Sequence, residues 1–385
     1  MNDVIYLDNN ATTRPLPEVV EALATVAAEV YANPSSVHQF GQHARHRVEC
    51  AREQVAAMIE ATGREIVFTS GGTESINLAI RGALRAVPGK RRLVTTAVEH
   101  SATMRLMEQL EEEGYEVRRV GVDGEGCLNE EQWETALGDD VALVSIMYAN
   151  NETGVLFDVP RLASVAASRG VTVHVDAVQA IGKVPIRVSD LPVALMSLSA
   201  HKFHGPKGVG ALYVRRRTRL VPLIVGGRQE RDLRGGTENV PGIVGMGIAA
   251  QAVVREMDAA RRDVAALRDA LERGILHRVP YARVHGGKAP RICNTSNIGF
   301  ENLQAEAILI LLSEAGICAS SGAACSSGSL EPSHVLKAMG IDPRSAHGAI
   351  RFSLSRFNTL VEVEHVIEIL PGLLARLRAL DAARA

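Results

Sequence analysis

Two segments decide the fold: residues 171–183, VTVHVDAVQAIGK, and residues 193–208, VALMSLSAHKFHGPKG. Each begins with apolar and β-branched residues and ends in polar ones, which is typical of a buried strand followed by a loop. Asp176 closes the first strand, and Lys202 follows the second. Because open α/β sheets bind ligands beyond the carboxyl ends of their strands, we expect these two side chains at one edge of a sheet.

Five more apolar runs repeat this pattern, and helical stretches follow most of the earlier ones. The runs are 66–70, 92–98, 115–122, 141–147 and 209–214. Buried strands that alternate with helices predict βαβ units, and hence a mostly parallel sheet with helices on both faces. The expected fold class is α/β.

The pattern changes after a long helical stretch at residues 240–276, which is rich in Ala, Arg and Leu. The elements expected beyond it are strands at 282–286, 294–300 and 349–355 and helices at 305–312 and 359–380. This mixture predicts a smaller α+β domain. We therefore expect a large domain over residues 15–257 and a small domain made of residues 1–14 and 258–385.

The composition excludes several classes of protein. The 385 residues carry 42 basic and 44 acidic side chains, a net charge of −2, which argues against nucleic acid or an anionic membrane as the main partner. The N-terminus has no signal-peptide core, and the most apolar stretch, 242–254, is too short to span a bilayer. Five cysteines without a CxxC pair fit a reducing compartment, so we expect a cytoplasmic protein.

A glycine turn at residues 68–75, FTSGGTES, joins a predicted strand to a predicted helix. Backbone N–H groups at such a helix start can bind a phosphate, although the segment also fits an ordinary turn with Thr73 as N-cap. Combined with Asp176 and Lys202, the turn suggests a site for pyridoxal phosphate. The lysine would form a Schiff base, the carboxylate would pair with the pyridinium nitrogen, and the turn would hold the phosphate.

Three further side chains are candidates for chemistry. Cys325 lies in a stretch of Ser, Gly and Ala at 319–329, where its thiol would be exposed enough to act as a nucleophile. Arg351 lies in an apolar predicted strand, and a bidentate contact with a carboxylate would explain it there. His100 follows a predicted strand and could stack on a ring or carry protons.

Simpler interpretations stay open for each candidate taken alone. Asp176 fits a loop carboxylate and Lys202 a solvated surface lysine. Arg351 fits a structural ion pair and His100 a hydrogen-bonded structural histidine. The remaining cysteines, which we interpret as small packed side chains, are Cys50, Cys127, Cys293 and Cys318.

Ten segments, in order along nearly the whole chain, resemble the NifS/IscS-type cysteine desulfurases. Their amino-acid sequences are most similar to those of NifS. They read YLDNNATTRP, NPSSVHQFG, FTSGGTES, VEHSA, MYANNETG, HVDAVQAIGK, SAHKFHGPKGVGALY, RGGTEN, SSGAACSSGSLEPSHVL and RFSLSRF. One departure is Ala323, where the family usually has Ser.

The resemblance implies the type I fold of pyridoxal-phosphate-dependent transferases and roles for individual residues. Lys202 would form the Schiff base, His100 would stack over the ring, and Cys325 would be the nucleophile. The residues that would bind the cofactor are Gly72, Thr73, Asp176, Gln179, Ser199, His201, Lys202 and, reaching the phosphate of the neighbouring subunit, Thr237. Asn151 and Arg351 would bind the substrate carboxylate.

The implied reaction removes sulfur from L-cysteine and gives L-alanine and a persulfide on Cys325. The implied partners are a second copy of the chain in a homodimer with shared active sites and an iron–sulfur scaffold protein as sulfur acceptor. Cys325 would meet metal only through transient contact with a cluster on that scaffold. The sulfur would serve iron–sulfur cluster assembly, either for nitrogenase or for general use.

Other functions remain compatible with the same residues. The chain could be a sulfur-carrying platform that holds a persulfide at Cys325 without pyridoxal chemistry. It could also be a selenocysteine lyase or a small-substrate aminotransferase, although an aminotransferase has no need for the Cys325 segment.

Overall fold

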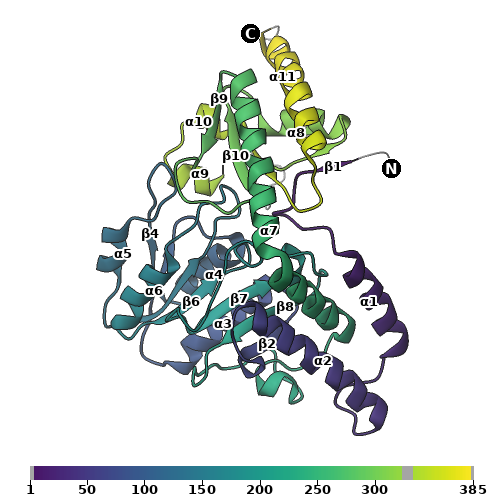
Figure 1. The fold of residues 1–385 in the computed structure, drawn as a ribbon. Coiled ribbons are helices and arrows are strands. Elements are labelled where there is room, and N and C mark those ends of the chain that lie inside the picture. Colours follow the sequence, from purple (N-terminus) through teal and green to yellow (C-terminus); the bar gives the residue numbers. More distant parts are fainter. Residues whose placement is uncertain (1–3, 323–332, 383–385) are drawn as a thin grey trace.

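The computed structural model describes residues 4–322 and 333–382. Within these residues, a large part surrounds a seven-stranded sheet and a small part surrounds a three-stranded sheet (Figure 1). Helix α7 (Val240–Arg278) runs from the large part into the small part (Figure 1).

The strands of the large sheet match the apolar runs of the sequence. In spatial order they are β2 (Ile66–Thr69), β8 (Gly210–Val214), β7 (Leu195–Ser199), β6 (Thr172–Asp176), β5 (Val141–Met147), β3 (Arg92–Thr96) and β4 (Glu116–Val120). Strand β8 is antiparallel to β2 and β7, and all other neighbours pair in parallel. The predicted mostly parallel α/β sheet is therefore confirmed.

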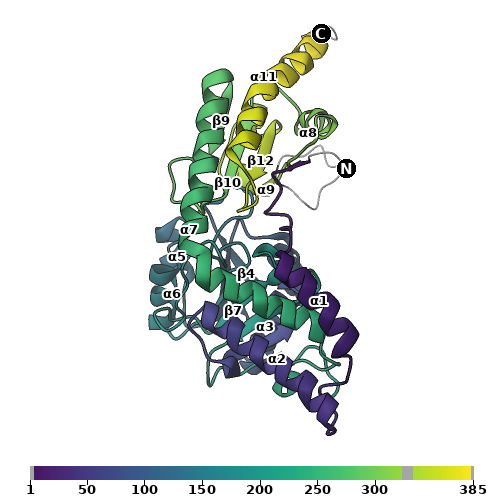
Figure 2. The ribbon, with the colours of Figure 1, turned by 45° about the vertical axis from the view of Figure 1, so that its right-hand side comes forward.

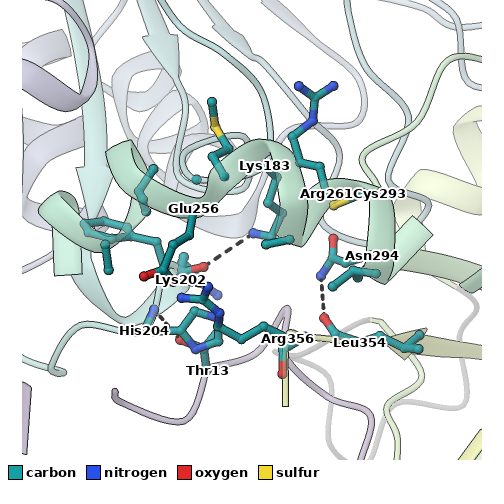
Figure 3. A pocket seen from close by; sticks show the side chains of 18 residues that line it. Thr13, Lys183, Lys202, His204, Glu256, Arg261, Cys293, Asn294, Leu354 and Arg356 are labelled. Atoms are coloured by element: carbon teal, nitrogen blue, oxygen red, sulfur yellow. Dashed lines mark hydrogen bonds and ion pairs between the residues drawn. The ribbon is translucent and has the colours of Figure 1, made fainter. Parts of the chain in front are cut away.

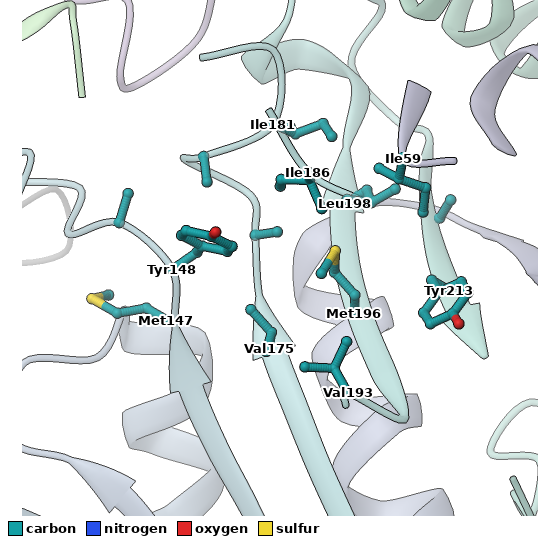
Figure 4. Packing of buried hydrophobic residues seen from close by; sticks show 14 of the residues in the cluster. Ile59, Met147, Tyr148, Val175, Ile181, Ile186, Val193, Met196, Leu198 and Tyr213 are labelled. Carbon is teal, nitrogen blue, oxygen red and sulfur yellow. The ribbon is translucent and has the colours of Figure 1, made fainter. Parts of the chain in front are cut away.

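Helices cover both faces of this sheet. Besides α7, they are α1 (Pro17–Glu29), α2 (Gln39–Met58), α3 (Gly72–Ala86), α4 (Ser101–Glu112), α5 (Glu130–Ala136) and α6 (Val159–Ser168). On β8, Ala211 and Tyr213 belong to one apolar core and Leu212 and Val214 to another, because successive side chains of a strand point to opposite faces. Figure 4 shows Met196 beside Tyr213 in the first of these cores.

The small part is α+β, as predicted. Its strands are β12 (Ala349–Ser353), β10 (Thr295–Phe300) and β9 (Ala282–His285), paired antiparallel in that order, with β1 (Ile5–Tyr6) parallel to β11 (Ile317–Cys318) in a separate pair. Its helices are α8 (Ala305–Glu314), α9 (His334–Ala338), α10 (Pro343–Ala346) and α11 (Leu360–Ala382).

Helix α7 belongs to the packing of both parts. Its first half contacts α1 and α2, and its second half contacts α11 and β9 (Figure 2). There Leu271 and Ile275 join the apolar core of the small part. The domain boundary expected between residues 257 and 258 falls inside this continuous helix.

One prediction about the cysteines is wrong. Cys50 is exposed, because it lies on α2 opposite the buried stripe formed by Ala44, Val48, Ala51 and Val55.

None of the helices in the described residues has the length and apolar content needed to span a membrane.

Candidate active site

A cavity of about 280 Å³ lies where the parallel strands of the large sheet end. Its walls come from the loops after β2, β3, β5, β6 and β7, from β12 and from the N-terminal arm. The carboxyl ends of parallel strands meet at one edge of a sheet, so residues far apart in the chain come together here.

Ten of the twelve predicted site residues line this cavity. They are Gly72, Thr73, His100, Asn151, Asp176, Gln179, Ser199, His201, Lys202 and Arg351. Thr237 is exposed and lies outside the cavity, in the turn before α7. Cys325 lies outside the described residues.

The amine of Lys202 is held by the N-terminal arm. Its Nζ donates hydrogen bonds to the carbonyl oxygens of Asn10, at 2.5 Å, and Ala11, at 2.9 Å. Burial, and after it the positive charges of Lys183 and Arg351, lower the pKa of Lys202 to about 7. A large fraction of this amine is therefore uncharged at neutral pH, which a nucleophile or a base requires.

Asp176 and Gln179 present acceptors that the protein does not fully use. Asp176 accepts a hydrogen bond from the backbone N–H of Val178 at 3.0 Å, and burial raises its pKa to about 6. Gln179 donates through Nε2 to the Asn10 carbonyl at 2.9 Å, while its buried Oε1 has no partner. An unpaired buried acceptor is costly, so these two side chains suit a ligand that brings hydrogen-bond donors.

The histidines of the cavity are neutral. His100 caps α4, and its Nδ1 accepts the backbone N–H of Ala102 at 3.1 Å, so the ring proton is assigned to Nε2. Burial, helped by the charge of Lys202, lowers the pKa of His100 to about 4. His201 contacts the Thr12 hydroxyl at 3.2 Å, and burial lowers its pKa to about 4 as well.

The N-terminus of α3 opens onto the cavity. The helix begins at Gly72, and the cap residue is Gly71, so Thr73 lies in the first turn and is not the N-cap. A Cβ at Gly72 would lie 2.9 Å from the Cγ2 atom of Val178, which explains the glycine. Free backbone N–H groups and the helix dipole favour an anion at this position.

Arg351 is buried and already paired. Its Nη2 donates to the Asp8 carboxylate at 2.7 Å and its Nη1 to the Asn151 carbonyl at 3.0 Å. The ion-pair interpretation of Arg351 therefore holds in this structure, although the side chain also lines the cavity. Sequence reasoning missed Asp8 and Asn10 as site residues, and the run DNN at 8–10 was the available signal.

The described residues on both sides of the segment that contains Cys325 contact a residue of the cavity wall or a neighbour of one in the sequence. On one side, Ser320 and Arg351 exchange backbone hydrogen bonds. On the other, Ser333 donates to the buried carboxylate of Glu152 at 2.5 Å, and His334 Nε2 contacts the Glu99 carbonyl at 2.9 Å.

The family model for class-V aminotransferases matches residues 5–366. This chain belongs to that family. Among its relatives, the cysteine desulfurase of Trichormus azollae is 51% identical over 378 residues, which cover 98% of this chain and 94% of that protein. The cysteine desulfurase NifS of Azotobacter vinelandii is 49% identical over 375 residues, covering 97% and 93%.

Solved structures agree with this placement. A structure described as a NifS-like protein superposes on this class-V aminotransferase with a TM-score of 0.92 and 40% identity, covering 97% of this chain and all of the other. The comparisons confirm the resemblance to NifS-type cysteine desulfurases, the α/β fold of type I and the prediction of an enzyme of this kind.

Proposed function

We propose that this enzyme is a pyridoxal-phosphate-dependent cysteine desulfurase that converts L-cysteine to L-alanine and holds the sulfur as a persulfide on Cys325. One observation carries the proposal. A single cavity brings together the amine of Lys202, the carboxylate of Asp176 and the N-terminus of α3. An amine, a carboxylate and a phosphate site are the groups that pyridoxal phosphate requires.

The residues present fit this cofactor. The unpaired Oε1 of Gln179 would accept from the ring hydroxyl, and Asp176 would pair with the ring nitrogen and keep its proton there. Gly72 has no side chain, so α3 can begin close to Val178, and the backbone N–H groups at this helix start would hold the phosphate. The residues that would hold the phosphate are Gly72, Thr73, Ser199 and His201.

When bound, pyridoxal phosphate would supply an aldehyde that combines with an amine and a ring that accepts electrons from Cα. Lys202, as a free amine, would remove the Cα proton of the substrate and return a proton afterwards. Neutral His100 would stack on the ring and present its Nε2–H to the substrate. Both groups need the low pKa values that burial gives them.

The substrate carboxylate would bind at Arg351 and Asn151. Arg351 is buried, and its Nε–H has no hydrogen-bond partner. The guanidinium could therefore bind the substrate carboxylate in addition to that of Asp8, or in its place. A bidentate carboxylate contact orients the substrate as well as binding it.

Cys325 would complete the reaction as a thiolate. It would attack the sulfur of the substrate, forming an S–S bond as the C–S bond breaks, and the remaining carbon skeleton would take up protons to become L-alanine. The described flanks support this role, because Ser320 pairs with Arg351 of the cavity wall and Ser333 contacts Glu152, the neighbour in sequence of Asn151.

The test compares two cysteine variants in protein loaded with pyridoxal phosphate. With L-cysteine and a reductant, we expect the wild type to form alanine and sulfide. We expect the rate of alanine formation by Cys325→Ala to be more than about 100-fold lower. Cys50→Ala, at an exposed cysteine on α2, is the matched control and should retain the wild-type rate. Full activity of Cys325→Ala would contradict the proposal, because alanine and sulfide would then form without a persulfide on Cys325.

The wider setting is part of the same proposal: a cytoplasmic homodimer that passes sulfur to an iron–sulfur scaffold protein, for nitrogenase or for general cluster assembly. Exposed Thr237 would reach the phosphate in the neighbouring subunit. In mixed dimers of Lys202→Ala and Thr237→Ala chains, one site keeps both residues. At limiting cofactor the mixture should therefore be more active than either variant alone. Activity equal to the mean of the two variants would contradict a shared site.

A further inference from the structure

A second, smaller cavity of about 60 Å³ lies behind Lys202. Figure 3 shows it between the loop that carries Lys202, helix α7 and the small part, with Lys183 and Cys293 on its wall. In the described chain, Lys202 is the one residue that lines both this cavity and the active-site cavity.

The side chain of Lys183 is the feature of this cavity that needs an explanation. The residue is only 9% exposed, and no carboxylate within the described ranges forms an ion pair with it. Its Nζ donates to the carbonyl oxygen of Gln179 at 3.1 Å. It also donates to the carbonyl oxygen of Lys202 at 3.5 Å (Figure 3). Burying an ammonium without a counter-ion is costly, so a purely structural role would be served better by an apolar side chain.

The two acceptors of Lys183 connect it to the active site. Gln179 lies in the turn after β6 and Lys202 in the loop after β7, and both line the larger cavity. The ammonium of Lys183 therefore contacts the peptide carbonyls of two active-site residues from the smaller cavity.

We propose that Lys183 is a positioning residue for Lys202, which fixes the peptide carbonyls of Gln179 and Lys202 and disfavours a second ammonium at the Lys202 side chain by its own charge. The proposal rests on the proposed function of Lys202. In the reaction, Lys183 touches neither substrate nor cofactor and acts only through Lys202.

The charges around the two amines agree with this role. The groups that act on Lys202 are Lys183, Arg351, Asp176 and Asp8, and Lys202 in turn acts on His100 and His201. After burial, Lys183 contributes most to lowering the pKa of Lys202. Burial lowers the pKa of Lys183 itself to about 8, opposed by Cys293, so Lys183 is still mostly an ammonium at pH 7.

The test measures the titration of the Lys202 amine in cofactor-free protein, so it does not depend on catalysis. Amines are acetylated with a trace of acetic anhydride across a pH series, and the extent at Lys202 is read by peptide mapping. In the wild type we expect half-maximal labelling near pH 7. In Lys183→Met the midpoint should rise by about one pH unit, because a nearby like charge is removed.

Two further variants make the outcome specific. Lys183→Arg, which keeps the charge and the donors, should return the midpoint toward the wild-type value. Lys288→Met, at a lysine whose side chain is 88% exposed, should leave it unchanged. The acid limb of kcat for L-cysteine, which reports the substrate complex in which Lys202 would be a free amine, should move with the labelling midpoint in Lys183→Met.

The labelling midpoint of Lys202 can also contradict the proposal. An unchanged midpoint in Lys183→Met would overturn the proposal. If Lys183→Met fails to fold, a wild-type midpoint at the ordinary lysine value would overturn it without any variant. A shifted midpoint in a protein that releases no alanine would instead leave Lys183 acting on Lys202 and refute the desulfurase function alone.

Discussion

At the scale of single residues, burial sets the protonation states of the site. It lowers the pKa of Lys202 and His100 and raises that of Asp176, so each group is driven toward its neutral form. A cofactor with a cationic ring nitrogen would reverse this for Asp176, since an adjacent positive charge favours the carboxylate. The cavity is thus better suited to its proposed ligand than to water.

Glu99 gives a prediction at the same scale. It is fully buried, its Oε1 accepts from Thr96 at 2.8 Å and Met147 at 2.9 Å, and its Oε2 has no partner. Burial, and to a smaller degree Asp176, raise its pKa to about 8. The folded protein therefore keeps a proton that the unfolded chain loses near pH 4.5, and this contribution to stability is lost as the pH rises through 8.

We expect Glu99→Gln, which cannot ionise, to gain in Tm relative to the wild type as the pH rises from about 5 to about 8. Thermal unfolding of cofactor-free protein at both pH values measures this difference. Glu108→Gln, at an exposed glutamate of α4, is the control and should show no such trend. A Tm difference for Glu99→Gln that does not change with pH would contradict the assignment.

At the scale of elements, the start of α3 determines whether a phosphate can bind. Gly72→Ala would place a Cβ atom 2.9 Å from Val178, which lies two residues after Asp176. We expect the dissociation constant for pyridoxal phosphate to rise by about tenfold, because overpacking costs about 1–3 kcal/mol. Absorbance titration with the cofactor measures this. Unchanged affinity would remove the N-terminus of α3 from the phosphate site.

The larger elements could be predicted from the sequence because their apolar residues follow a clear period. The run at 141–147 coincides with β5, and the helical stretch from 240 ends two residues short of the end of α7. The paired strands β1 and β11 were not predicted, because each has two residues, which are too few to show alternation. The alternative with Thr73 as the N-cap of α3 is not observed in the structure. Gly71 takes that position, without a side-chain hydrogen bond.

Most of the candidate site could be predicted as well, because parallel strands deliver their following residues to one edge. What the sequence did not reveal are contacts that depend on tertiary packing. These contacts join segments that no local sequence pattern connects. They are the ion pair of Asp8 with Arg351, the hydrogen bond from Lys202 to the Asn10 carbonyl and the hydrogen bond from buried Lys183 to the Lys202 carbonyl.

At the scale of the whole molecule, the close approach of α7 and α11 holds the small part together. A Cβ at Gly274 of α7 would lie 2.4 Å from Ile367 of α11, whereas one at Gly372 of α11 would meet nothing within 4 Å. We expect Gly274→Ala to lower the free energy of unfolding by about 1–3 kcal/mol. Gly372→Ala should raise it by about 0.5–1 kcal/mol, because alanine favours helix.

Denaturant unfolding of both variants measures these changes. Equal stabilities for Gly274→Ala and Gly372→Ala would show that the two helices do not need glycine where they meet. The pair is matched, since both glycines lie inside long helices and differ in what surrounds them.

The central claim is that the cavity at the end of the large sheet holds pyridoxal phosphate on Lys202. The most direct test is reduction of the cofactor-loaded protein with borohydride, followed by peptide mapping of the pyridoxyl group. The chain offers six lysines, at 90, 183, 202, 207, 288 and 337. We predict that the label is found on Lys202. A label on another lysine, or none on any, would contradict the account and favour a sulfur-carrying platform without pyridoxal chemistry.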